Sequence, residues 1–293
     1  MKTPVERGKF KPNMNYSDFY NECAAVLESA GIENFRNEAR WLILEPFQLS
    51  GAVLFSQTDV PPEQLKCVRD LCARRCKHEP LQYLLGNAPF GEIELSVTPA
   101  VLIPRCETVS LVEHALAHLP PGGTMLDVGC GSGAIALLAA FRRPDIRVTA
   151  LDKSAAALAV AKENAVKLGL TARVGFLESD LVSAVAGSRF DLIAANLPYV
   201  TFDEYAELAA DVRDYEPEMA LTAPDNGMAL IKQLIADAPE VLVRGGRLVL
   251  EMSPHQTGIA KEELGACGYD DISVFADQFE KMRFVSAVFS LNA

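Results

Sequence analysis

The feature that most constrains the fold is a regular alternation of short apolar runs and longer helical patterns that begins at Thr124. The short runs are rich in Val, Ile and Leu and predict buried strands, and the longer segments carry apolar residues at helical spacing. Strict alternation of this kind favours a mostly parallel sheet with helices on both faces. We therefore predict an α/β fold with a mostly parallel, seven-stranded sheet. The predicted strands are 124–128, 146–151, 172–177, 189–195, 246–252, 269–275 and 283–290, and the helices between them are 133–142, 154–168, 226–238 and 256–266.

The rest of the chain divides into shorter parts that precede this alternation. Residues 1–15 are polar, lack the apolar stretch of a signal peptide, and are predicted to be a flexible lead-in. Residues 16–86 show helical patterns and are predicted to form a small N-terminal helical domain. Residues 87–105 change to a period of two, which predicts a β-hairpin linker. Residues 106–293 are then the large α/β domain, and a helix near 107–118 is expected to open it.

Local signals predict where the first two helices begin and end. Ser17 is a candidate N-cap for a helix that runs to Ala30, and Gly31 is suited to the position just beyond its end. A second helix is predicted over about 36–49. Pro46 lies inside it and is expected to kink it or to end it early.

The hairpin is predicted from alternation alone. Phe90, Ile93, Leu95 and Val97 are spaced mostly by two, with polar residues between them. This pattern indicates a half-buried strand. We expect that strand to pair with a second one at Ala100–Ile103.

Composition excludes several classes of function. The net charge is -12, and the acidic excess lies in residues 91–293, which argues against a protein that binds by neutralising phosphates. No apolar run is long enough for a membrane span. Seven cysteines without a regular framework suggest a reducing, cytoplasmic setting, and no cluster has the spacing of a metal site. The basic residues between 66 and 77 are either a solvated helix face or a docking surface for an acidic or RNA-bound partner.

A glycine-rich turn follows the first strand of the large domain, in the sequence Asp-Val-Gly-Cys-Gly-Ser-Gly at 127–133. Glycine allows positive φ and close approach of a ligand to the backbone. The spacing differs from the dinucleotide fingerprint, and no Lys-Ser or Lys-Thr pair of a phosphate-binding loop follows. The acidic Asp127 before the glycines suits a positively charged ligand and would repel a diphosphate.

Acidic residues also follow the next two strands. Asp152 comes about twenty residues after the glycines, where a carboxylate can accept hydrogen bonds from ribose hydroxyls. Asp180 follows the third strand and can accept from an adenine amino group. Each carboxylate alone is more often a helix cap or a solvated loop residue, and Asp152 can partly cap the helix after it. The ordered series of turn, Asp, Asp and the loop described next is much more specific.

The fourth strand ends in Asn-Leu-Pro-Tyr at 196–199. The Asn196 amide offers an acceptor and two donors in a fixed plane, and Pro198 restricts both itself and Leu197. Tyr199 offers a flat face. Such a loop can hold a planar nitrogen, because carbonyl oxygens accept its N–H bonds while a ring packs on it. An ordinary loop after a strand is the alternative interpretation.

The complete series resembles the Rossmann-like S-adenosylmethionine-dependent methyltransferases. Three further segments, 79–86, 97–105 and 211–217, narrow the resemblance to the bacterial release-factor glutamine N5-methyltransferases, over nearly the whole chain. That family has a helical N-terminal domain, a β-hairpin linker and a catalytic domain, and it methylates the glutamine amide of the Gly-Gly-Gln loop in peptide-chain release factors. The resemblance implies S-adenosyl-L-methionine as cofactor, no metal, a release factor as partner and no direct contact with nucleic acid.

The resemblance also implies the roles of individual residues. The catalytic loop is Asn196, Leu197, Pro198 and Tyr199, in which the Asn196 side chain and the Leu197 carbonyl accept both N–H bonds of the substrate amide. The implied cofactor contacts are Asp127, Gly129, Gly131 and Gly133 around the methionine part, Asp152 at the ribose and Asp180 near the adenine. Cys130, Lys153, Leu181 and Asn196 are further implied cofactor contacts. The implied substrate contacts are Phe90, Arg105, Glu107, Asn196 and Tyr199.

Three positions depart from the family pattern, and all are on the acceptor side. Leu197 replaces the first proline of Asn-Pro-Pro-Tyr, Val109 replaces a glutamate, and Gly91 replaces an aromatic residue. These changes are either neutral or the mark of a different acceptor, such as a small amide, amine or carboxylate. Adenine methylation of a nucleic acid is less favoured because of the net charge. A cofactor-binding protein without catalysis is least favoured, since the residue series is complete.

Overall fold

The computed structural model describes residues 14–290, and these form two compact units. The first unit contains residues 14–86 together with Ala210–Tyr215, and the second contains 87–209 and 216–290. Most of the predicted lead-in therefore lies outside the described residues. The segment at 210–215 was predicted with the large domain, but its contacts assign it to the first unit, where the Tyr215 hydroxyl donates to the Lys77 carbonyl at 2.8 Å.

The first unit is helical. Its elements are α1 (Tyr16–Ser29), α2 (Phe35–Leu44), α3 (Pro62–Arg75), α4 (Leu81–Leu85) and α9 (Ala210–Arg213), with 3₁₀ turns at Glu45–Phe47 and Gly51–Phe55. The helices bury one apolar cluster that includes Phe19, Leu42 and Val68. The ion pair between Glu38 and Arg75 is also buried and closes at 2.6 Å.

Two local predictions for these helices have different outcomes. The N-cap of α1 is Asn15, whose side chain accepts from the Asp18 N–H, so the prediction of Ser17 as the cap is wrong. Asparagine is at least as good a cap as serine, and it lies two residues earlier. Helix α2 ends at Leu44, and the chain continues as a 3₁₀ turn through Pro46, which confirms that this proline ends the helix early.

The hairpin forms with a different partner from the one predicted. Strand β1 (Asn87–Phe90) pairs antiparallel with β2 (Ile93–Ser96), and Phe90 is opposite Ile93. The expectation that Ala100–Ile103 is a strand is wrong. The reason is Gly91, whose φ of +57° permits a tight turn between the strands, so both arms of the hairpin end before Val97.

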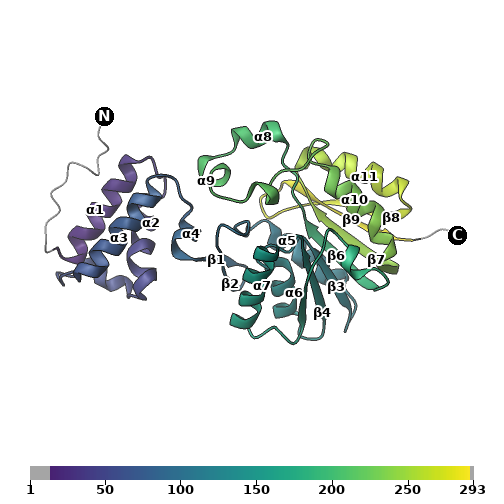
Figure 1. Ribbon diagram of the computed structural model, residues 1–293, viewed down its shortest axis with the longest axis horizontal. Coiled ribbons are helices and arrows are strands. Elements are labelled where there is room, and N and C mark those ends of the chain that lie inside the picture. The colour runs from purple at the N-terminus through teal and green to yellow at the C-terminus, as the bar shows by residue number, and fades with distance from the viewer. Residues whose placement is uncertain (1–13, 291–293) are drawn as a thin grey trace. The chain divides into compact units, whose positions relative to one another are not determined.

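The second unit contains the predicted seven-stranded sheet, and the fold class is confirmed. The strand order is β5-β4-β3-β6-β7-β9-β8, with β3 to β7 parallel and β9 antiparallel to both of its neighbours (Figure 1). The strands are β3 (Thr124–Val128), β4 (Arg147–Asp152), β5 (Val174–Glu178), β6 (Phe190–Asn196), β7 (Leu242–Glu251), β8 (Tyr269–Ala276) and β9 (Met282–Phe289).

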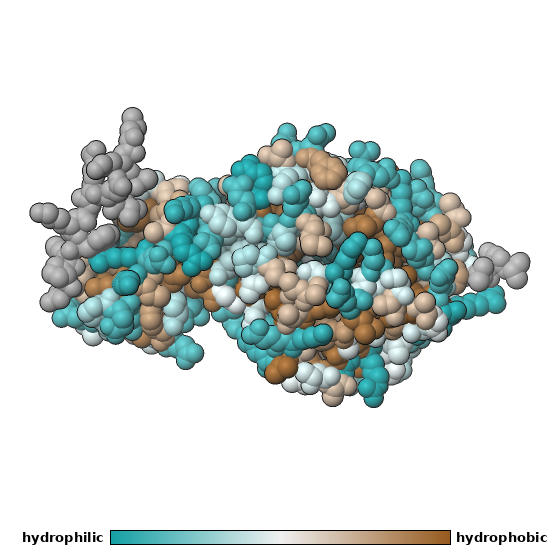
Figure 2. Space-filling view, viewed as in Figure 1, coloured by the Kyte–Doolittle hydropathy of each residue, from teal (hydrophilic) through white to brown (hydrophobic). Residues whose placement is uncertain are grey.

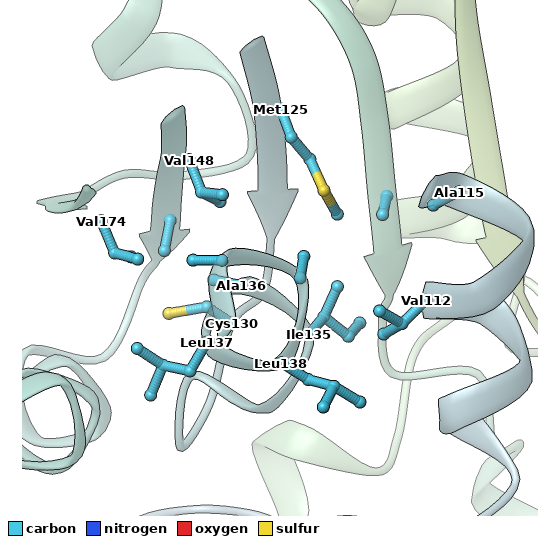
Figure 3. Close-up of a cluster of buried hydrophobic side chains, with 14 of the residues drawn as sticks. Val112, Ala115, Met125, Cys130, Ile135, Ala136, Leu137, Leu138, Val148 and Val174 are labelled. Atoms are coloured by element: carbon cyan, nitrogen blue, oxygen red, sulfur yellow. The ribbon is translucent and has the colours of Figure 1, made fainter. Parts of the chain in front are cut away.

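Helices cover both faces of this sheet. Helices α5 (Thr108–His118), α6 (Ala134–Arg142) and α7 (Ala155–Lys167) pack on one face with the hairpin. Figure 3 shows buried apolar side chains of α5 and α6 against those of the strands. Helices α10 (Ala229–Asp237) and α11 (Thr257–Ala266) cover the other face. The short helix α8 (Phe202–Glu207) follows the loop after β6. The strand order reverses between β3 and β6, and ligands of open α/β sheets bind at such a switch point.

The outer surface is mixed in character. On the face shown in Figure 2, hydrophilic side chains are interspersed with smaller apolar patches. In the described part of the chain, no helix combines the length and the apolar character that crossing a membrane requires.

One buried amide connects the hairpin to the sheet. Asn164 of α7 is fully buried, accepts from the Ser96 N–H at 2.6 Å, and donates to the carbonyls of Ser96 and Ser132, each at 3.0 Å. It therefore ties the end of β2 to the glycine-rich turn.

We expect Asn164→Ala to lower the free energy of unfolding by roughly 3 kcal/mol, because it removes the partners of three backbone groups that are buried or partly buried. Urea unfolding followed by circular dichroism measures this loss. The matched control is Glu163→Ala at the neighbouring exposed position, which should stay within about 0.5 kcal/mol of wild type. Equal stability of the two variants would contradict the proposed tie.

Candidate functional site at the carboxyl edge of the sheet

The glycine-rich turn after β3 is held against the end of β4. The N–H groups of Gly129 and Cys130 both donate to the Leu151 carbonyl, each at 2.8 Å. Gly131 has a φ of +54°, and a Cβ built on it would meet no protein atom within 4 Å. The backbone of the turn is thus exposed to open space on one side, where a ligand can approach it closely.

The two predicted aspartates lie on the same edge of the sheet. The Asp152 carboxylate accepts from the Gly131 N–H and from the Ser154 N–H, each at 2.8 Å. Two hydrogen bonds fix its orientation and leave further lone pairs for a ligand. Asp180 is exposed and forms an ion pair with Lys153 at 2.7 Å, and Leu181 next to it has a φ of +47°.

The Asn-Leu-Pro-Tyr loop lies across from the turn. The Asn196 amide group donates to the Thr108 hydroxyl at 3.2 Å. Leu197 is buried against Gly129, where a Cβ on the glycine would come within 2.9 Å of a Leu197 methyl. The glycine-rich turn and the Asn-Leu-Pro-Tyr loop are therefore in direct contact.

The Gln256 side chain fixes the backbone at Tyr199. The Gln256 side-chain amide donates to the carbonyls of Tyr199 and Asn226, at 2.8 and 2.9 Å. Burial, together with the nearby Glu251 carboxylate, raises the pKa of the Tyr199 hydroxyl to about 12. The Tyr199 ring packs against the apolar cluster on the face of the sheet that α10 and α11 cover.

These elements enclose a cavity of about 360 Å³, within the range of small-molecule sites. The turn, the ends of β4 and β5, the loop after β6 and the segment before α5 all contribute to its wall. Sequence-predicted residues in the wall are Phe90, Arg105, Gly129, Cys130, Gly131, Asp152, Lys153, Asp180, Leu181, Asn196, Leu197 and Pro198.

Four predicted site residues lie beside the cavity rather than in its wall: Asp127, Gly133, Glu107 and Tyr199. Gly133 packs against Leu137 and Ala161 at the start of α6. Glu107 is half-buried and accepts a hydrogen bond from the Cys106 thiol.

Asp127 is fully buried beneath the turn. One carboxyl oxygen accepts from the Ala136 N–H at 3.0 Å, and the other has no hydrogen-bond partner among residues 14–290. Burial raises the pKa of Asp127 to about 7, and the Asp152 charge adds to this rise. A cation in the cavity would favour the ionised form of this carboxyl.

Arg105 is positioned by an ion pair that the sequence did not reveal. Its guanidinium lies 2.6 Å from a carboxylate oxygen of Glu216, which is buried, and the other oxygen accepts from the Ile103 N–H at 3.0 Å. Glu216 thus fixes the Ile-Pro-Arg segment against the cavity. In the sequence, the segment at 211–217 is marked only by the family resemblance.

Thr108 and Glu251 were also missed, and both adjoin Asn196. Thr108 lines the cavity, and Glu251 is opposite Asn196 in the pairing of β6 with β7. The Glu251 position carried one available signal: it is an acidic residue at the carboxyl end of an apolar strand, as Asp152 is.

Comparison with known proteins agrees with this geometry. Residues 108–212 match the family model described as methyltransferase small domain, and residues 18–86 match the PrmC N-terminal domain. A release factor glutamine methyltransferase of Geobacter sulfurreducens is 38% identical over 84% of this chain and 86% of its own length. The enzyme of the same name from Escherichia coli is 36% identical over 92% and 97%, respectively.

The chain belongs to the release factor glutamine methyltransferase family. A human relative named MTRF1L release factor glutamine methyltransferase is 35% identical over 78% of this chain and 73% of its own length. The family resemblance and the methyltransferase prediction are thereby confirmed.

Solved structures of lower identity share the fold. The hMettl16 catalytic domain covers 76% of this chain and 82% of its own chain at a TM-score of 0.56 and 17% identity. A methyltransferase from Pyrococcus furiosus covers 67% of this chain and 89% of its own at a TM-score of 0.52 and 18% identity.

The raised pKa of Asp127 predicts a pH-dependent stability. The folded state holds the Asp127 proton more tightly than the unfolded state does. The protonated carboxyl therefore contributes to the free energy of unfolding at low pH, and this contribution is lost as the pH rises to about 7. When the pH is raised from 5 to 8, the free energy of unfolding of the Asp127→Asn variant should increase by roughly 2 kcal/mol relative to that of the wild-type protein. Denaturant unfolding at both pH values measures this, and parallel pH curves would contradict it.

The close approach of Gly227 to the Tyr199 backbone predicts a steric effect of any side chain at position 227. A Cβ there would overlap the Tyr199 carbonyl oxygen, and the backbone φ is +79°. We expect Gly227→Ala to destabilise the protein by more than about 3 kcal/mol in urea unfolding. Gly187→Ala is the control, because Gly187 has a φ of +84° but open space around it, so its cost should be only about 1–2 kcal/mol. Similar losses in both variants would refute the steric argument.

Proposed function

We propose that this protein transfers a methyl group from S-adenosyl-L-methionine to the side-chain nitrogen of the glutamine in the Gly-Gly-Gln loop of peptide-chain release factors. The observation that carries the proposal is the position of Asn196, whose amide is oriented by Thr108 at the wall of a cavity that the glycine-rich turn also lines. The names of relatives at 35–38% identity over most of the chain support the same substrate.

The residues around the cavity fit the proposed cofactor. When bound, S-adenosyl-L-methionine supplies an electrophilic methyl group on a positively charged sulfur. Gly131 leaves open space beside the backbone, and the unpaired oxygen of Asp127 beneath the turn favours a cation. We assign Asp127, Gly129, Cys130, Gly131 and Gly133 to the methionine part, Asp152 and Lys153 to the ribose, and Asp180 and Leu181 to the adenine.

The acceptor side must orient a poor nucleophile. An amide nitrogen has a delocalised lone pair, so two acceptors on its N–H bonds are needed to aim that lone pair and to stabilise the developing charge. Because the Asn196 amide donates to Thr108, its carbonyl oxygen remains for one N–H of the substrate. We assign the Leu197 carbonyl to the other N–H and Tyr199 to packing beside the loop. Phe90, Arg105 and Glu107 are assigned to the peptide around the glutamine.

Each departure from the family pattern has a structural accommodation. Leu197 fills the space beside Gly129 and stiffens the loop by packing. Gly91 makes the hairpin turn, and Val109 packs against the apolar cluster on the face of the sheet that α5 covers. These roles favour retention of the family substrate over a small amide, amine or carboxylate.

The net charge of this chain indicates which class of partner it binds. The net charge of -12 disfavours an RNA or DNA acceptor, so we propose a protein substrate and no direct contact with nucleic acid. The first helical unit is proposed as the region that docks the release factor.

The test is the intact mass of an unmethylated bacterial release factor after incubation with this protein and S-adenosyl-L-methionine. We expect a gain of one methyl group that maps to the glutamine of the Gly-Gly-Gln loop. Asn196→Ala should reduce turnover by at least about 100-fold while cofactor affinity changes by only a few-fold. Confirmed cofactor binding without any mass gain by the wild-type protein would refute the release-factor substrate and favour a small-molecule acceptor.

A further inference from the structure

Gln256 carries a buried side-chain amide in which both the oxygen and the nitrogen have hydrogen-bond partners. It is the last residue of the 3₁₀ turn Pro254–Gln256, just before α11, and it is only 1% exposed. Its side-chain oxygen accepts from the Ser253 N–H at 3.0 Å, and its NH₂ group donates to the carbonyls of Tyr199 and Asn226, at 2.8 and 2.9 Å. Backbone N–H groups only donate and backbone carbonyls only accept, so the Gln256 amide has one possible orientation.

One of these bonds goes to a strained turn. Asp225, Asn226 and Gly227 are three consecutive residues with left-handed backbone, at φ of +55°, +52° and +79°. Two of them carry side chains, which disfavour this conformation, and it persists only where the surrounding structure holds it. The Gln256 bond to the Asn226 carbonyl supplies part of that support. The Gly227 backbone is so close to the Tyr199 carbonyl that a Cβ would overlap it, so the turn is packed directly against the end of the Asn-Leu-Pro-Tyr loop.

The bond from Gln256 to Tyr199 fixes the far end of the Asn-Leu-Pro-Tyr loop. The near end is fixed by the sheet, because Asn196 is the last residue of β6 and is paired with β7. Only Leu197 and Pro198 lie between these two ends. Proline has a fixed φ and also restricts the residue before it. The Leu197 carbonyl therefore has little freedom as long as the Tyr199 carbonyl stays bonded to Gln256.

The residue after the loop, Val200, connects it to another part of the cavity wall. The Val200 N–H donates to the Leu221 carbonyl at 2.9 Å, and the Val200 carbonyl accepts from the Ala223 N–H at 3.1 Å. Thr222, between these two partners, lines the cavity. A loop released at Tyr199 would therefore also loosen the Val200 N–H bond, which makes that N–H a reporter of the loop.

We propose that Gln256 is a positioning residue that keeps the Leu197 carbonyl and the Asn196 side chain aimed at the nitrogen that accepts the methyl group. It acts through the Tyr199 carbonyl and is not itself in the wall of the cavity. The inference rests on the proposed function in one respect, namely that the acceptor nitrogen has two N–H bonds for these two oxygens to receive. A misplacement of about 1 Å can cost roughly 100-fold in rate, so the role should be visible in kcat.

The closing experiment compares variants of the full-length protein on a bacterial release factor. Gln256→Met keeps a similar volume and removes both donors. Gln256→Glu keeps an acceptor for the Ser253 N–H but turns a carboxylate oxygen toward two carbonyl oxygens. We expect kcat to fall about 10-fold in Gln256→Met and about 100-fold in Gln256→Glu, while KM for the release factor stays within about 3-fold of wild type.

Leu264→Ala is the matched control for a loss of stability alone. Leu264 is buried in α11, the helix that Gln256 precedes, and its truncation weakens the packing of that helix without removing the Gln256 bonds. Its kcat should stay within about 2-fold of wild type, at a temperature at which circular dichroism shows every variant to be folded. Affinity for S-adenosyl-L-methionine, measured by calorimetry, should stay within about 2-fold in all variants.

Hydrogen exchange followed by mass spectrometry tests the same contact without any acceptor. The Val200 N–H should exchange at least about 10-fold faster in Gln256→Met than in the wild-type protein, because the released loop opens its bond to Leu221 more often. In Leu264→Ala, the rate should change by less than about 3-fold.

The outcomes separate this inference from the proposed function. If the wild-type protein binds S-adenosyl-L-methionine but methylates no release factor, the proposed function fails, and the exchange of the Val200 N–H still decides whether Gln256 holds the loop. Wild-type exchange in Gln256→Met would overturn the inference. It would also be overturned if Gln256→Met and Gln256→Glu kept the wild-type kcat, if they changed only KM, or if Leu264→Ala lost as much kcat as Gln256→Met.

Discussion

The site depends on one backbone carbonyl, that of Leu151, which accepts N–H bonds from both Gly129 and Cys130. These two bonds hold the turn after β3 against the end of β4, and the turn lines the cavity there. The absence of a side chain at Gly129 then admits Leu197 from the loop after β6. The glycine-rich turn and the loop after β6 are therefore packed together, and a displacement of either would move the other.

Two buried carboxyl groups, those of Asp127 and Glu251, lie at this edge of the sheet, and their surroundings differ. Asp127 holds the first turn of α6 through the Ala136 N–H and places negative charge under the turn. Glu251 is buried and lies opposite Asn196 in the pairing of β6 with β7, so it places a second carboxyl group beside the loop after β6. Both have pKa values raised to about 7 by burial, so both couple the state of the site to pH. A cationic ligand would stabilise the ionised forms of both.

Local sequence signals predicted elements well where one residue dominates and poorly where two signals compete. Pro46 ended α2 as expected, because a proline removes an N–H that the helix needs. Ser17 lost the capping position to Asn15, since both residues are good caps and nothing local distinguishes them. The alternation from Phe90 to Val97 was identified correctly as β structure, but Gly91 divides it into two short arms. Alternation alone does not locate a turn within a strand pattern.

The sequence by itself determined the α/β class and the order of polar residues at the ends of the strands. This was possible because parallel strands bring their carboxyl ends to one edge, so Asp152, Asp180 and Asn196 had to lie near the turn. Only the tertiary structure decided which residues orient them. Thr108 reaches Asn196 across 88 residues of chain, and Glu216 reaches Arg105 across 111. Such pairs depend on strand register and helix packing, which no local spacing encodes, and so the partners of the predicted residues became visible only in the folded protein.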